Sequence, residues 1–210
     1  MVSAWRASPD REDDVPRAKQ RTPELQERIL DAAIGVLAAD GAAAVTTRRV
    51  AAAAHTSAPA IYELFGAKSG LIRAVFFEGF RRLVSRFDTL APPTGEPADL
   101  IVVLEAFRSF TQDNPRLFEV MYARPFEVYT PEPDERSLGD ATRSVFVDRA
   151  KGCVAAKTLS GDPVDIAHAV LGLAVGLATQ ETAGWLGTNS NDCDRRWADA
   201  SRALLDGYSG

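Results

Sequence analysis

One stretch limits the possible folds of this chain more than any other: residues 46–71, TTRRVAAAAHTSAPAIYELFGAKSGL. Thr46 or Thr47 suits a helix N-cap, because the hydroxyl can accept a hydrogen bond from a free backbone N–H of the first turn. Ser57 can cap a second helix, and Pro59 is tolerated in its first turn, where the N–H groups have no intrahelical partner. The stretch therefore predicts two short helices joined by a tight turn, followed by the start of a third.

The second of these helices has two different faces. Ile61 and Phe65 point to one side, whereas Ala58, Ala60 and Tyr62 are left to face outward beside the free N-terminal amides. Two short helices of which the second is small or polar on its outer face form a helix-turn-helix pattern, and that second helix can enter the major groove of DNA. An ordinary pair of core helices would give the same pattern, because short helical hairpins are common.

From Thr22 to about Leu83 the chain resembles the DNA-binding domain of the tetracycline-repressor-like (TetR) regulators. The matching segments follow one another without a gap: ILDAA at 29–33, Gly41, TTRRVA at 46–51, PAIY at 59–62, Phe65 and Lys68. The resemblance implies an all-α protein with two domains. Residues 22–83 would form a three-helix DNA-binding domain, with the helix-turn-helix at 46–65, and residues 84–210 an all-helical effector-binding and dimerisation domain.

The resemblance also implies a function. It predicts a ligand-responsive transcriptional regulator, most simply a repressor that a small, largely apolar effector releases from a palindromic operator in double-stranded DNA. The alternative is a helical small-molecule-binding or adaptor protein whose helix-turn-helix is not used for transcription. Binding to a palindromic duplex that weakens with added salt would separate the two hypotheses, because only the first requires phosphate contacts.

The predicted DNA contacts share small or polar side chains near the starts of three helices. They are Thr46, Thr47, Arg48, Ser57, Ala58, Pro59, Ala60, Tyr62 and Lys68. Arg48 is the best base-reading residue, because its guanidinium matches the O6/N7 edge of guanine, although a merely solvated arginine would look the same. Tyr62 suits a backbone phosphate or, alternatively, the core. Lys68 stands at a helix start, where free amides already attract anions.

Three positions depart from the family pattern. His55 stands where a glycine is usual, Leu64 where a histidine is frequent, and Ala67 where a capping serine is frequent. A residue other than glycine at the turn requires a strained or altered backbone. The departures leave the expected fold in place, but the operator sequence does not follow from them.

Charge is distributed unevenly along the chain. Residues 17–83 carry 10 Lys/Arg and 6 Asp/Glu, a net charge of +4, whereas residues 84–210 carry 12 and 19, a net charge of −7. A basic end beside an acidic remainder suits a protein that places one end on a polyanion. Residues 1–21 mix charge and proline with few apolar groups, so we expect a disordered tail there.

The sequence contains no recognisable pattern of catalytic, metal-binding or membrane-spanning residues. The two cysteines and two histidines match no zinc or disulfide spacing. No nucleophile–base pair or phosphate-binding glycine loop stands out, so we expect no enzyme, no catalytic residue, no metal and no cofactor. No apolar run reaches the roughly 18 residues of a membrane helix, and no signal peptide is evident. We therefore expect a cytoplasmic protein without a membrane partner.

The C-terminal part is predicted to be helical throughout. The expected helices cover residues 98–111, 115–123, 137–159, 163–186 and 192–207. The helix at 163–186 is apolar nearly all round, with Gly172 and Gly176 in its middle, so it must be covered on more than one side. A homodimer that joins the last two helices to their copies would cover it, as would complete burial within one chain.

An aromatic-rich set of residues is predicted to line an effector pocket in this part of the chain. The set is Phe107, Phe110, Phe118, Met121, Tyr122 and Phe126. The same residues would serve equally well as ordinary core, because an apolar stripe at helical spacing is the usual sign of a buried face.

Overall fold

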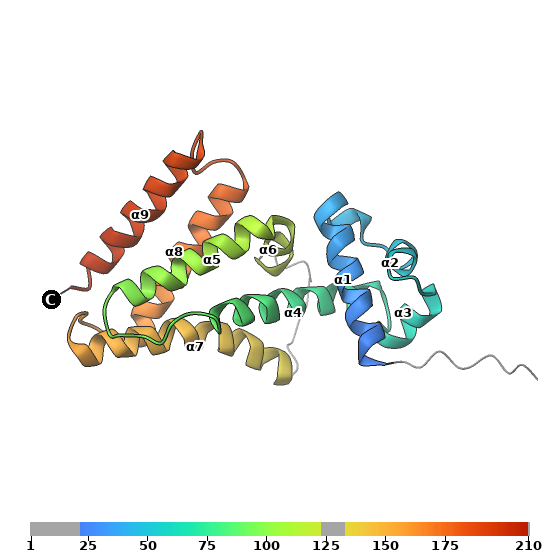
Figure 1. Cartoon of the computed structure of the whole chain (residues 1–210), viewed down its shortest axis with the longest axis horizontal. Helices are drawn as coiled ribbons and strands as arrows, with labels where there is room; N and C mark the ends of the chain where they lie inside the picture. The colour runs from blue at the N-terminus through green and yellow to red at the C-terminus, as the bar shows by residue number, and fades with distance from the viewer. Residues whose placement is uncertain (1–21, 123–132, 210) are drawn as a thin grey trace, which may run out of the picture.

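A computed structural model of the chain describes residues 22–122 and 133–209. All regular structure in these ranges is helical, which confirms the predicted all-α fold class. The helices are α1 (Pro23–Asp40), η1 (Ala42–Ala44), α2 (Thr47–Ala53), α3 (Ala58–Phe65), α4 (Lys68–Phe87), α5 (Ala98–Asp113), α6 (Pro115–Tyr122), α7 (Pro133–Ala156), α8 (Pro163–Thr182) and α9 (Ser190–Asp206). Figure 1 shows α1 to α3 gathered at one end of α4, and α5 to α9 gathered around its other end.

The N-terminal helices begin at the residues that the sequence predicts. The Thr22 hydroxyl accepts a hydrogen bond from the Leu25 amide, and Thr46 and Ser57 do the same for α2 and α3. Each of these bonds satisfies one backbone donor that the first helical turn leaves free. Because each cap lies within three residues of the amide it satisfies, the starts of these helices are determined by local sequence.

The larger body is built around α5, which lies between α4, α7 and α8. Its inward side chains Leu100, Leu104 and Phe107 are almost completely buried. The helix α8 packs against α7 on one side and α5 on another, and α9 packs on α8. Phe146 of α7 closes this core with an edge-on contact to Phe87 of α4, at 5.8 Å between ring centroids.

Some helix ends differ from the predicted ones. The helix α7 begins at Pro133 rather than at 137, because proline is tolerated in a first turn. It ends at Ala156, where Lys157 takes a φ of +62°, and α8 ends at Thr182, shortly before Gly184 with a φ of +75°. A left-handed residue ends a helix by turning the chain away from its axis. The short helix η1 was not predicted.

The helix α8 is more exposed than its mainly apolar composition would suggest. By length and composition alone α8 could cross a membrane, contrary to the prediction that no segment is long and apolar enough. Only 28% of its apolar window is buried, and Val164 is exposed. Beside Gly172 and Gly176, an added Cβ atom would meet nothing within 4 Å. One side of α8 is therefore packed on α5, α7 and α9, while another side, which includes the exposed Val164, His168, Gly172 and Gly176, is open.

Candidate DNA-binding face and regulatory core

The outer ends of α2 and α3 are tied together by two predicted contact residues. The hydroxyls of Thr47 and Tyr62 lie 3.3 Å apart, a hydrogen-bond distance. Tyr62 is 50% exposed, so its ring belongs to the surface rather than to the core. The hydroxyl proton that is not used in this bond can be donated to a phosphate oxygen, which is the chemistry predicted for these residues.

The two arginines of α2 have different surroundings. Arg48 is exposed and has no ion-pair partner within residues 22–122 and 137–209. Arg49 is also exposed, but its guanidinium pairs with Asp40 at the end of α1, at 2.5 Å. An unpaired guanidinium keeps all its donors available for a base edge, whereas a paired one would first have to leave its carboxylate.

The remaining predicted contacts lie around the start of α3 and α4. Thr46 and Ser57 use their oxygens as caps, which leaves each O–H free to donate. Pro59 is exposed, and Ala58 and Ala60 are partly exposed beside it, so this surface offers apolar contact. Lys68 is exposed in the first turn of α4, where Ala67 provides no side-chain cap. The amides of that turn therefore remain available to an anion beside the Lys68 ammonium.

The turn between α2 and α3 is held by a residue that the sequence analysis missed. Arg28 of α1 donates from Nε to the Ala54 carbonyl at the end of α2, at 3.2 Å. His55 follows with a φ of +51°, so the turn has the left-handed residue that the usual glycine would supply. The arginine satisfies a terminal carbonyl and fixes where α2 ends. No sequence pattern links two positions so far apart in the chain.

A close contact joins α4 to α6. A Cβ atom at Gly79 of α4 would come within 2.5 Å of the Met121 sulfur and 3.3 Å of Leu117, both of α6. Glycine thus permits these two helices to approach more closely than any other residue would. Further along α4, the Arg86 guanidinium pairs with Asp113 of α5 at 2.8 Å. A shift of α6 toward α4 would displace α4 directly, because position 79 has no side chain whose movement could accommodate the shift.

The predicted effector residues are partly gathered into one aromatic cluster. The ring centroid of Tyr122 lies 4.9 Å from that of Phe118 and 6.1 Å from that of Phe107, and Phe80 of α4 joins at 5.9 Å. Phe110 and Met121 are buried, with Met121 against Gly79. Phe126 lies outside the described residues, as does the tail at residues 1–21. Burial raises the pKa of the Tyr122 phenol well above its ordinary value of 10, so the hydroxyl stays neutral.

A cavity of about 230 Å³ adjoins this cluster. Phe118 and Tyr122 of α6 form one wall, and Thr179 and Thr182 of α8 form another. Phe107, Phe110 and Met121 do not line it. The lining is mainly apolar, with Thr179, Thr182 and Glu119 as its polar groups, and the volume lies below the roughly 300–1,000 Å³ of most small-ligand sites.

A partly buried polar cluster joins α5, α8 and α9 at the other side of α8. Glu181 accepts hydrogen bonds from Arg108 (2.7 Å), Gln112 (3.1 Å) and the Trp197 indole (2.7 Å). Burial alone would raise the pKa of Glu181, but the bonds from Arg108, Trp197 and Gln112 outweigh it and lower the pKa. The sequence suggested Glu181 only as a polar group in an apolar helix, and its partners could not be identified.

Comparison with known proteins agrees with this architecture. Residues 29–75 match the family described as bacterial regulatory proteins, tetR family, and residues 100–204 match the tetracyclin repressor-like C-terminal domain. No curated protein matches the chain. Solved structures with 18–22% sequence identity share the fold, as the following relatives illustrate.

One is a regulatory protein of the tetR family from Rhodococcus RHA1, 22% identical, with a TM-score of 0.66, covering 90% of this chain and 98% of its own. Another is the TetR family transcriptional regulator PfmR from Thermus thermophilus, 19% identical, with a TM-score of 0.61 and coverages of 85% and 97%. A third is a TetR variant from Acinetobacter baumannii AYE in complex with minocycline, 18% identical, with a TM-score of 0.62 and coverages of 85% and 93%. The two family matches span most of the described residues, and the chain therefore belongs to the TetR family of DNA-binding transcriptional regulators, which are not enzymes.

Proposed function

We propose that this protein is a ligand-responsive repressor that binds a palindromic operator as a homodimer and is released by a small, largely apolar effector. The observation that carries the proposal is the shared helix α4. Its first turn carries Lys68 beside the reading helix, and Gly79 in the same helix touches Met121 of α6. A ligand that moves α6 therefore acts on the reading head through one rigid element.

The DNA-binding part of the proposal assigns roles to the residues at the starts of α2, α3 and α4. Arg48 reads a base edge in the major groove, and Ala58, Pro59 and Ala60 offer apolar contact to thymine methyl groups. Thr46, Thr47, Ser57, Tyr62 and Lys68 bind backbone phosphates. The Thr47–Tyr62 hydroxyl pair and the exposed Arg48 guanidinium support this division, because the first suits a phosphate and the second a base.

Replacement of Arg48 by alanine tests the base-reading role. We expect Arg48→Ala to weaken operator binding by about 1–3 kcal/mol and to relax the preference at one base pair of each half-site. Arg49→Ala is the matched control, since it removes the same charge from the same helix but breaks a pair with Asp40. Arg49→Ala should weaken binding to all DNA sequences by the same factor. Fluorescence anisotropy measures the affinity of each variant for operator and scrambled duplexes. An unchanged operator affinity in Arg48→Ala would reject the base-reading role of Arg48.

The homodimer is proposed to form through α8 and α9. The open side of α8 supports it, because Gly172 and Gly176 leave room for a second helix to approach closely. Trp185, which is 79% exposed just beyond α8, adds a large apolar surface. A second copy rather than lipid is the proposed cover, since α8 already packs on α5, α7 and α9. Two-fold symmetry would then match a palindromic operator.

The effector is proposed to bind at the aromatic cluster of Phe107, Phe118 and Tyr122. The adjoining cavity of about 230 Å³ supports a site there, and Phe110, Met121 and Phe126 complete the predicted set. The relative solved with minocycline is a member of this fold with a small molecule bound, which is consistent with a ligand in this chain. The proposal places the reading head in residues 22–83, the effector and dimer functions in 84–210, and the protein in the cytoplasm.

Selection of bound sequences from random duplex DNA tests the repressor proposal as a whole. We expect a palindrome with half-sites about one helical turn apart, and binding that weakens as salt is added. Addition of the true effector should then lower affinity for this palindrome. Enrichment of no sequence at low salt would instead favour a helical adaptor or small-molecule-binding protein.

A further inference from the structure

The helix α1 and the middle of α4 are separated by a polar groove. The groove has a volume of about 460 Å³ and is lined by residues 27–31 of α1 and residues 78–85 of α4. Because the side chains of the two helices do not fill this space, the helices do not interlock at this level. Here, packing alone does not fix the angle between α1 and α4.

An ion pair crosses the groove. Arg82 of α4 pairs with Asp31 of α1 through Nη2, and its Nε donates to Glu78 of the same helix at 2.9 Å. Glu78, which also pairs with Arg81, is only 17% exposed, so this carboxylate holds the Arg82 guanidinium in place. Little further side-chain freedom is lost when the oriented guanidinium pairs with Asp31.

This ion pair joins the DNA-binding helices to the larger body. Figure 1 shows α1 to α3 at one end of α4, with α6 beside the part of α4 that enters the body. Arg82 lies within one turn of Gly79, where α4 contacts Met121 of α6. The Arg82–Asp31 pair therefore links the first DNA-binding helix to the point at which α4 meets the body.

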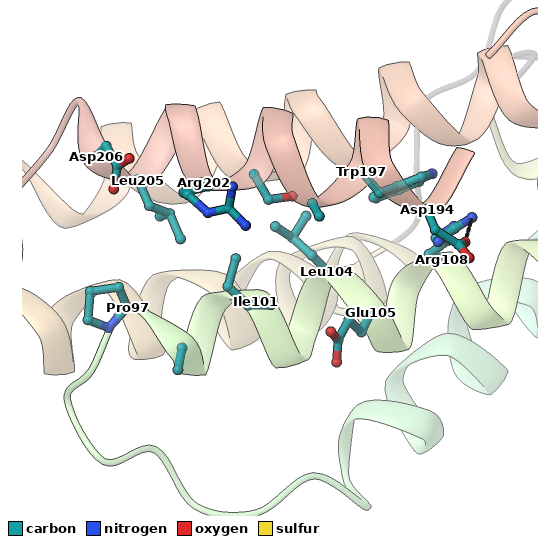
Figure 2. Close-up of a pocket in the computed structure, with 13 residues that line it drawn as sticks. Pro97, Ile101, Leu104, Glu105, Arg108, Asp194, Trp197, Arg202, Leu205 and Asp206 are labelled. Atoms are coloured by element: carbon teal, nitrogen blue, oxygen red, sulfur yellow. Dashed lines mark ion pairs between the residues drawn. The ribbon is translucent and has the colours of Figure 1, made fainter. Parts of the chain in front are cut away.

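Charged pairs of the same kind also join helices inside the body. Arg86 of α4 pairs with Asp113 of α5 at 2.8 Å, and Arg108 of α5 pairs with Asp194 of α9 at 2.7 Å. Figure 2 shows the second pair at one end of the space between α5 and α9. These pairs connect body helices to one another, so they do not act on the angle of α1.

We propose that Asp31 and Arg82 are positioning residues that set the angle of α1 to α3 on the body, and with it the half-site spacing that the dimer accepts. The inference rests on the proposed operator-binding homodimer. Each base pair added between half-sites moves the second one by about 3.4 Å and rotates it by about one tenth of a turn. Two sets of DNA-binding helices held at a fixed angle therefore match one spacing. Because Asp31 is 69% exposed, the pair adds little to folding stability.

Operators of different spacing test this assignment. The probes are the palindrome selected from random duplex DNA and two versions of it, with one base pair inserted at or removed from the centre. When the spacing changes, Asp31→Asn should lose roughly threefold less affinity than the unaltered chain, because an exposed ion pair is weak. Asp31→Glu retains a carboxylate and should retain the spacing preference. The melting temperatures of these chains should be equal.

Asp113→Asn is the matched control. It also removes one carboxylate that pairs with an arginine of α4, but that pair lies inside the body, so the spacing preference should not change. The ratio of affinities between two spacings cancels the general effect of removing a negative charge from a DNA-binding protein. Equal ratios in Asp31→Asn and the unaltered chain would overturn the proposal, as would equal relaxation in Asp113→Asn. Selection of no palindrome by the unaltered chain would count against the proposed operator binding instead.

The angle is also measurable without DNA. Nitroxide labels at Ala52→Cys of α2 and Lys151→Cys of α7, both exposed positions, report the distance between the two parts by double electron–electron resonance. The background carries Cys193→Ser, and labelled chains are diluted with unlabelled protein. Asp31→Asn should broaden the distance distribution, whereas Asp113→Asn should not. An unchanged width in Asp31→Asn would overturn the proposal whether or not an operator is found.

Discussion

A Gly172→Glu/Gly176→Glu variant will be monomeric and will bind the palindromic operator about 10²–10⁴-fold more weakly than the unaltered chain. The two glycines lie on the open side of α8, and a Cβ atom at either would meet nothing within the same chain. Helix propensity favours glutamate over glycine by several tenths of a kcal/mol per position, so the monomer itself should not be weakened. Two facing copies of α8 would, however, bring four carboxylates together between closely packed helices.

The loss of operator affinity follows from the loss of the second half-site. In a dimer, binding of one reading head holds the other at a high effective concentration near the DNA, and a monomer lacks this advantage. Gly139→Glu of α7 is the matched control, because that glycine is also open and exposed but belongs to another helix. Analytical ultracentrifugation gives the oligomeric state and anisotropy the affinity. A double variant that remained dimeric would remove α8 from the proposed interface.

Replacement of Glu181 by alanine should cost about 3 kcal/mol of folding stability, and hence about 6–12 °C in Tm. Glu181 and Arg108 are only 15% and 16% exposed, so the substitution leaves an arginine nearly buried without its main partner. The Trp197 indole and Gln112 lose an acceptor at the same time. Because Arg108 retains Asp194 and some access to water, the cost should fall at the low end of the range for broken buried pairs.

Asp194→Asn provides the comparison for this prediction. Asp194 contacts the same guanidinium at 2.7 Å but is 62% exposed, so its removal should cost no more than about 1 kcal/mol. Denaturant unfolding of both variants at neutral pH measures the difference. Equal destabilisation by the two substitutions would show that burial does not determine how much each carboxylate contributes to folding stability.

The pH dependence of stability gives an independent check on Glu181. Its pKa in the folded chain is lowered from 4.5, so folding favours the ionised form. The corresponding stability is fully present above pH 4.5 and is lost as pH falls through the lower folded pKa. Stability of the unaltered chain should therefore fall more steeply below pH 4.5 than that of Glu181→Ala. Parallel curves would mean that Glu181 titrates alike in the folded and unfolded states.

Features set by neighbouring residues were predictable from the sequence. Thr22, Thr46 and Ser57 cap their helices as expected, because each cap involves an amide three residues away. The helical period likewise showed which face of each helix is apolar. The helix ends at Ala156 and Thr182 were missed, because a positive φ at Lys157, and the choice among nearby glycines, depend on what the following segment packs against.

From the sequence, local spacing and the family resemblance together determined the all-α class and the helix-turn-helix at residues 46–65, and composition determined the basic charge of the N-terminal third. Only the tertiary structure decided which distant groups meet: Thr47 with Tyr62, Arg28 with the Ala54 carbonyl, and Arg108 with Glu181. These contacts depend on the angles and distances at which helices cross. Crossing geometry results from the packing of many side chains at once, so no single segment of the chain specifies it.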